Sequence, residues 1–235
     1  MGHPLDAAVA DPWAALRLVI GEPLHPGGTE ATEALLDRAD VGPDTWLLDV
    51  GCGAGGPVSV AYERGARAVG LDRQPSGSAM LQGDLETLPI ATGGFDVVLA
   101  ECVLCLAEDP GRAMEEAARV LGPDGRLALS DVVLEGPLPD LPRPIERVLC
   151  LNGPRSREDL QDRLHAAGFE VGPVSDHREA LLELRDRAGS RVDYERLLPA
   201  FGDRGRRLLD GVHQLEAAVE AGDVSYVSLV ARAPG

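Results

Sequence analysis

A cluster of glycines directly after a short apolar segment constrains the fold of this chain more than any other feature. Residues 46–50 are apolar except for Asp49, and four glycines follow them: Gly51, Gly53, Gly55 and Gly56. A short apolar run that ends in glycines is typical of a buried strand in a parallel sheet. Glycines let the backbone turn tightly and approach a bound molecule, because no Cβ stands in the way. We therefore expect a strand at 46–50 with a ligand site at its carboxyl end.

The rest of the chain alternates between strand-like and helix-like segments, which indicates a parallel α/β sheet. Further strands are expected at 68–72, 96–100, 126–133, 169–174 and 224–231, and helices at 29–40, around 114–121 and from 156 to 168. The helix that begins at Ser156 has Asp159 three residues later, which is the spacing of a capping box. We predict a Rossmann-like, doubly wound and mostly parallel seven-stranded sheet.

We expect one domain over 1–235, with an N-terminal helical cap at 1–45 and a helical insertion at 178–222. The insertion places Leu208, Val212, Leu215 and Val219 on one helical face. It is longer than a normal connection between two strands. We interpret it as a cap over the site or as a contact between subunits, and the oligomeric state stays open.

The charge of the chain limits its partners. The formal net charge is −17, and every Lys or Arg position is arginine. So acidic a surface repels phosphate backbones and anionic lipids, which favours a small molecule over nucleic acid or membrane as partner. No apolar run approaches the roughly 18 residues of a membrane span, and the N-terminus lacks a signal-peptide pattern. We expect a cytoplasmic protein whose four cysteines are free thiols.

The spacing of the glycines alone is ambiguous, because Gly51, Gly53 and Gly56 also match the dinucleotide-binding pattern. Two carboxylates distinguish the alternatives. Asp49 stands two residues before the first glycine, where it would hold a cationic amino-acid group rather than a pyrophosphate. Asp72 ends the next strand, where a carboxylate can accept both hydroxyls of a ribose.

This series, continued by Asp84-Leu85 and by Phe95-Asp96-Val97-Val98, resembles the class I S-adenosylmethionine-dependent methyltransferases from about Asp49 to Val133. The resemblance implies that Asp49 and the glycines line the methionine end of the cofactor, Asp72 the ribose, and Asp84 with Leu85 the adenine. The cofactor-binding set that we expect is Asp49, Gly51, Cys52, Gly53, Gly55, Asp72, Arg73, Asp84, Leu85 and Glu101.

The connection between the second and third strands is unusually short. Only eleven residues separate Asp72 from Asp84, and they include Pro75 and Gly77. A parallel crossover usually takes a dozen or more residues. We therefore expect a loop here and a more open adenine side of the pocket.

The cysteines carry a second resemblance. Cys102 and Cys105 follow the strand at 96–100, and Cys150 precedes the helix that begins at Ser156. These segments resemble the arsenite methyltransferases, in which a cysteine just after strand four and one just before the next helix hold trivalent arsenic. Cys102 and Cys150 match those positions, whereas no cysteine precedes Cys52. Soft thiolates suit a soft centre, but free cysteines also pack as small apolar side chains.

Three polar residues have two interpretations each. Glu101 is a candidate general base or substrate anchor, or a contact of the cofactor. His25 either closes over the bound molecules or belongs to a simple turn. His177 either caps the insertion or acts as a base. No spacing predicts a metal site.

We conclude from the sequence that the chain transfers a methyl group from S-adenosylmethionine to a small molecule by direct displacement. The first hypothesis for the acceptor is a soft nucleophile (trivalent arsenic, a selenol or a thiol) at Cys102 and Cys150, with Cys105 and His25 as further substrate contacts. One alternative is an O-, N- or C-methyltransferase of secondary metabolism, with Glu101 or His177 as base. Another is a regulator that binds the cofactor without catalysis.

Overall fold

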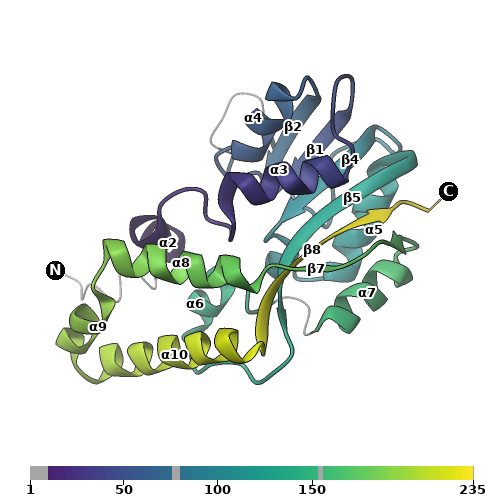
Figure 1. Ribbon diagram of the computed structural model, residues 1–235. Helices are drawn as coiled ribbons and strands as arrows, with labels where there is room; N and C mark the ends of the chain where they lie inside the picture. Colours follow the sequence, from purple (N-terminus) through teal and green to yellow (C-terminus); the bar gives the residue numbers. More distant parts are fainter. Residues whose placement is uncertain (1–9, 76–79, 153–155, 235) are drawn as a thin grey trace.

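The computed structural model describes residues 10–75, 80–152 and 156–234, and a twisted sheet with helices on both faces forms its centre (Figure 1). The strands follow the order β3-β2-β1-β4-β5-β8-β6, and β7 pairs with β8. Their bounds are β1 Trp46–Val50, β2 Arg67–Asp72, β3 Met80–Gln82, β4 Phe95–Glu101, β5 Leu121–Leu134, β6 Glu170–Val171, β7 Ser175–Asp176 and β8 Val224–Arg232.

The strands β1 to β5 run parallel, and β8 is antiparallel to β5. This mostly parallel sheet, covered on both faces, confirms the predicted Rossmann-like class. Val50 at the end of β1 lies opposite Ala100 in β4. The register therefore places the glycine cluster beside Glu101, at the carboxyl edge of the sheet.

The sheet has eight strands rather than seven because the predicted strand at 169–174 is divided. Gly172 donates its N–H to Val230 O at 3.0 Å, but Pro173 has no N–H and cannot continue the ladder along β8. The chain resumes pairing only at Ser175. The result is two short strands, β6 and β7, on the same side of β8.

The crossover from β2 to β3 spans residues 73–79. Residues 73–75 are not helical, and residues 76–79 lie outside the described ranges. Strand β5 is irregular around residues 122–125, because Phe95 pairs with Leu121 while Val97 pairs with Arg126.

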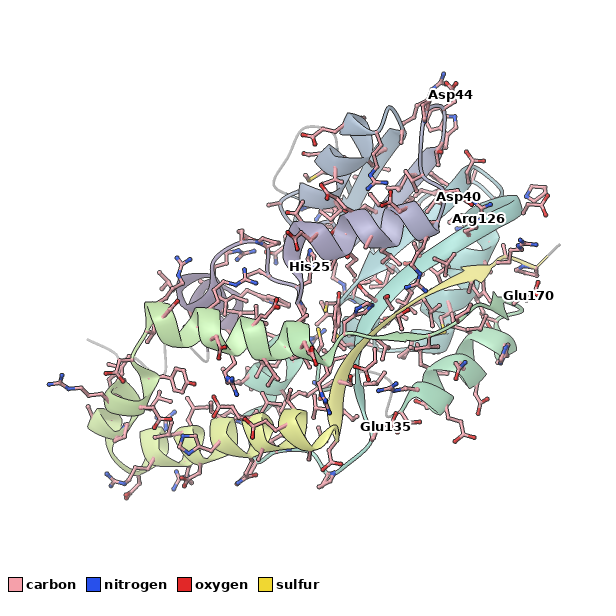
Figure 2. The ribbon with its side chains drawn as sticks, viewed as in Figure 1. His25, Asp40, Asp44, Arg126, Glu135 and Glu170 are labelled. Carbon is pink, nitrogen blue, oxygen red and sulfur yellow. The ribbon has the colours of Figure 1, made fainter. Side chains whose placement is uncertain are left out.

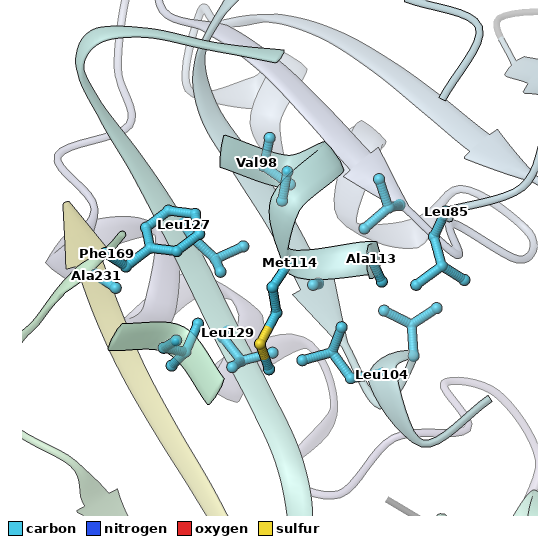
Figure 3. Close-up of a cluster of buried hydrophobic side chains, with 14 of the residues drawn as sticks. Leu85, Val98, Leu104, Ala113, Met114, Leu127, Leu129, Phe169 and Ala231 are labelled. Atoms are coloured by element: carbon cyan, nitrogen blue, oxygen red, sulfur yellow. The ribbon is translucent and has the colours of Figure 1, made fainter. Parts of the chain in front are cut away.

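Helices cover the sheet in two layers (Figure 1). On one face α5 and α7 enclose a cluster centred on Met114, which is fully buried against Leu127 and Leu129 of β5 (Figure 3). On the other face α3 and α4 bury a second cluster that includes Leu36 and Val58. The bounds are α2 Pro12–Ile20, α3 Gly28–Arg38, α4 Gly56–Glu63, α5 Pro110–Val120, α6 Arg143–Val148 and α7 Arg157–Ala166, with a 3-10 turn η1 at Leu104–Leu106.

Side-chain caps explain where several helices begin. Asp109 accepts the N–H of Arg112 and starts α5, and Ser156 accepts the N–H of Asp159 at 3.0 Å and starts α7. The second contact is the one expected of the Ser156 cap. Such caps satisfy N–H groups that have no partner within the helix.

The chain between β7 and β8 forms a helical insertion that extends away from the sheet (Figure 1). It consists of α8 (Arg178–Arg191), α9 (Tyr194–Leu197), a 3-10 turn η2 (Leu198–Phe201) and α10 (Gly202–Ala221). Helix α2 packs against α8 and α6. None of the described helices is long and apolar enough to span a membrane.

Candidate functional site

The glycine loop joins β1 to α4 and is held in an unusual backbone conformation. Gly51, Gly53 and Gly55 have φ values of 74°, 52° and 82°, which side chains rarely tolerate. A Cβ on Gly51 would lie 2.4 Å from Val103 Cγ2. The N–H of Gly53 donates to Asp72 Oδ2 at 3.0 Å, so the carboxylate at the end of β2 fixes the loop.

Two carboxyl groups lie buried beside this loop. The Asp49 residue is 2% exposed, and the Glu101 side chain is 4% exposed. Asp49 Oδ2 and Glu101 Oε1 each lack a hydrogen-bond partner. Burial, together with the proximity of Glu101 and Asp72, raises the pKa of Asp49 well above its usual range, and burial also raises the pKa of Glu101. Two unpartnered buried carboxylate oxygens form a site that favours a cation.

Glu101 is connected to the segment that precedes α3. Thr32 donates its hydroxyl to Glu101 Oε2 at 2.9 Å, and His25 Nδ1 lies 4.0 Å from Glu101 Oε1. The His25 ring also contacts Pro26 O and the Thr32 hydroxyl. His25 lies just before α3 (Figure 2), and its distance to Glu101 places it near the end of β4. The hydroxyl of Thr32 was not predicted, and only its position seven residues after His25 could have suggested it.

Cys102 and Cys150, the pair that the resemblance suggested for a soft centre, lie close together in the structure. The Sγ atoms of Cys102 and Cys150 and a carboxylate oxygen of Asp131 lie within 4.8 Å of one another. Cys102 and Cys150 both have positive φ values, 51° and 58°, which are uncommon for residues with a side chain. A hydrogen bond with Cys150, followed by burial, raises the pKa of Cys102 well above its usual range. The thiols therefore stay protonated at neutral pH until a ligand displaces the protons.

Cys105 contacts both Asp131 and Cys102 of this cluster. Cys105 donates its N–H to Asp131 Oδ2 at 3.3 Å, and its Sγ lies 3.6 Å from Cys102 O. Burial raises the pKa of Asp131 to about 7 and that of Cys105 to about 12. Asp131 was not predicted as a site residue, because one aspartate inside an apolar strand gives no spacing signal.

Among the predicted cofactor contacts, Arg73 and Leu85 line the cavity described below, whereas Asp84 does not. Asp84 Oδ2 accepts from Arg73 Nε at 2.9 Å, so these two predicted residues form an ion pair. Leu85 is 8% exposed and lines the cavity described below, as does Arg73. Cys52 packs with Val58 in the cluster under α4, and burial raises its pKa to about 12.

One cavity of about 1510 Å³ connects these groups. It begins at the glycine loop and Asp72, passes Glu101, Cys102 and Cys150, and continues between α2, α8 and α10. Asp84, Cys105 and Asp131 are not among its lining residues. His177 is also outside it, where its Nε2 contacts Ser228 Oγ at 2.7 Å.

A family model for a methyltransferase domain matches residues 48–129. The methyltransferase GfsG of Streptomyces halstedii is 31% identical over 78% of this chain and 73% of that protein. The arsenite methyltransferase of Halobacterium salinarum is 30% identical over 60% of this chain but only 41% of that protein. The O-methyltransferase cnsE of Penicillium expansum is 29% identical over 75% of this chain and 68% of that protein.

The chain is a class I S-adenosylmethionine-dependent methyltransferase.

The fold of this methyltransferase agrees with solved structures of the class. A phosphoethanolamine N-methyltransferase of Haemonchus contortus, solved with S-adenosylmethionine, superposes with a TM-score of 0.70 at 18% identity, over the whole of this chain and 61% of that one. The residues present here fit the cofactor. Asp49 Oδ2 and Glu101 Oε1 are buried and have no hydrogen-bond partner among the described residues. The ammonium group of the cofactor is a cation that could donate hydrogen bonds to both.

Proposed function

We propose that this methyltransferase acts on a bulky, mostly apolar small molecule that binds beside the cofactor. The observation that carries this proposal is the continuous cavity of about 1510 Å³. Ligand pockets usually measure roughly 300–1,000 Å³. The cavity therefore exceeds what the cofactor requires and leaves room for a second molecule. The relatives of Streptomyces and Penicillium support a small-molecule acceptor.

In this proposal the cofactor occupies the glycine-loop end of the cavity. Asp49 and Glu101 hold its ammonium group. Asp72 accepts the ribose hydroxyls, since each of its carboxylate oxygens has two lone pairs and accepts one backbone N–H, from Gly53 or from Gln74. Arg73 and Leu85 contact the adenine side, with Asp84 orienting Arg73. The cofactor supplies an activated methyl group on a sulfonium. Thr32 and His25 keep Glu101 in position.

The residues at the end of β4 then orient the acceptor. Cys102, Cys150 and Leu106 line the cavity where it leaves the glycine loop. A molecule held against them is placed beside the sulfonium end of the cofactor, and alignment of this kind is the main contribution of a protein to methyl transfer. The apolar walls exclude water from the reaction.

A second candidate is a thiophilic acceptor, and the convergence of Cys102 and Cys150 at the cavity wall favours it. Two thiols within 4.8 Å of a carboxylate can bind a soft trivalent centre and leave one face of it open to the methyl group. The likeness to arsenite methyltransferases of Halobacterium supports this candidate.

Methyl transfer to a panel of acceptors separates the two candidates. The panel contains arsenite with glutathione, a small thiol, and hydroxylated apolar compounds, and released S-adenosylhomocysteine is measured. We expect the wild-type protein to methylate an apolar acceptor. The Cys102→Ser/Cys150→Ser variant should retain at least about one third of the wild-type rate, because serine keeps the shape of the wall.

Two outcomes would contradict the first candidate. Turnover of arsenite alone, reduced more than about a hundredfold in the double variant while S-adenosylhomocysteine still binds, would establish the thiophilic acceptor instead. Cofactor binding without turnover of any acceptor would favour the non-catalytic regulator.

A further inference from the structure

The helical insertion has an apolar side that the described chain covers only in part. Helix α8 has 14 residues, yet none of them is fully buried. Its side chains Leu181, Leu184 and Ala188 line the cavity instead. A helix with an apolar stripe normally buries that stripe against a core. In α8 the stripe faces a space, which is the arrangement expected of a wall for an apolar ligand.

The opposite walls of this space have the same character. Val212 and Leu215 of α10 line it, as do Phe201 of η2 and Leu16 of α2. We call this part of the cavity, bounded by α2, α8, η2 and α10, the insertion chamber. Leu215 also packs on the cluster that contains Cys150, so the chamber continues directly to the thiols.

The polar side chains that interrupt the apolar lining at this end include Tyr194, Glu216 and Arg185. Tyr194 donates its hydroxyl to Glu216 Oε1 at 2.7 Å, and both residues line the chamber. The nearby cation Arg185 is already paired with Asp186 and with Glu220. The carboxylate of Glu216 is therefore the group that a ligand meets at this end. In an apolar pocket, a few polar groups determine the orientation of the ligand.

We propose that the insertion chamber is the acceptor-binding site and that Glu216 selects acceptors with a hydrogen-bond donor, a hydroxyl or an amine, remote from the methylated atom. This inference rests on the proposed function and names the acceptor class of the same cavity. The acceptor is an apolar skeleton with a polar donor at one end. An acceptor with a carboxylate at that end is rejected, because it would face Glu216 without a free cation.

The chain contains a reporter for this site. It has two tryptophans, Trp13 and Trp46. Trp13 lines the cavity, whereas Trp46 lies at the amino end of β1 under Arg67. Trp46→Phe leaves Trp13 as the one fluorophore of its kind, so its emission reports whether the chamber is occupied.

The probes are 1-decanol, decylamine and decanoic acid, which share one ten-carbon chain. In the Trp46→Phe background we expect saturable changes of Trp13 emission with the alcohol and the amine. The acid should bind at least about tenfold more weakly, because a buried carboxylate pair is repulsive. Glu216→Gln, which keeps an acceptor for Tyr194, should weaken decylamine about tenfold and change decanol less than about threefold. Asp210→Asn, which removes an exposed carboxylate of α10 outside the lining, is the matched control.

Val212→Phe tests the place of binding, since the larger ring projects into the chamber where the probe would lie and does not fluoresce like tryptophan. It should abolish the probe response while S-adenosylhomocysteine binds as before. Equal affinities for the three probes, an unchanged preference in Glu216→Gln, or a response that survives Val212→Phe would overturn the proposal. Calorimetry with S-adenosylhomocysteine on the same samples distinguishes failure of the chamber assignment from failure of the proposed function. If it binds and the probes do not, only the chamber assignment is wrong. If it does not bind either, the proposed function fails as well.

Discussion

Replacing Asp49 by asparagine is expected to weaken the binding of S-adenosylhomocysteine by at least about a hundredfold. The product keeps the ammonium group of the cofactor, and Asp49 Oδ2 is a buried oxygen without a partner. Truncating one member of a buried charge pair costs roughly 2–5 kcal/mol, and about 2.7 kcal/mol corresponds to a factor of one hundred. Calorimetric titration of the two proteins measures the difference.

Asp96→Asn is the matched control for this change. Asp96 lies at the other end of the sheet, where its side chain accepts the N–H of Trp46 at 2.8 Å. Its replacement should leave the affinity within about twofold. Equal affinities of wild type and Asp49→Asn would show that the ammonium group binds elsewhere, and would remove the basis on which we place the cofactor.

Replacing Gly205 by alanine is expected to lower the free energy of unfolding by about 2–4 kcal/mol. A Cβ at this position would lie 1.8 Å from Leu198 O, where α10 passes η2, and a carbonyl of the backbone cannot move aside as a side chain can. Overpacking of a close contact typically costs roughly 1–3 kcal/mol, occasionally more. Denaturant unfolding followed by circular dichroism measures the change.

Gly189→Ala in α8 is the comparison within the same insertion. Its Cβ would have only Tyr194 Cε1 at 3.9 Å, an ordinary contact. Alanine should stabilise this helix by roughly 0.5–1 kcal/mol. If Gly205→Ala were as stable as wild type, α10 and η2 would not approach each other as closely as the structure shows.

The sequence was most informative where a local pattern determines the structure. The apolar run at 46–50 and the glycines after it placed β1 and the loop correctly, because strand length and positive φ both leave a signal in the residue types. The resemblance singled out Cys102 and Cys150 but left open whether they approach each other, and in the structure their Sγ atoms lie close together.

Other features depend on contacts between distant segments and leave no such signal. Thr32 reaches Glu101 across 69 positions of the chain, and Asp131 meets the thiols only once β5 lies beside β4. The strand at 169–174 was predicted as one element because its apolar residues mask the effect of Pro173 on the ladder. The direction in which the insertion faces could not be predicted, since an apolar helical face looks the same whether it covers a ligand or another subunit.

The most direct test of the central claim is a crystal structure of the protein with S-adenosylhomocysteine. The cofactor position proposed above puts the ammonium group within hydrogen-bond distance of Asp49 and Glu101. It also turns the sulfur toward the wall formed by Cys102 and Cys150, with the insertion chamber open beyond it. A product molecule bound away from the glycine loop, or one whose sulfur is closed off from the insertion chamber, would contradict it.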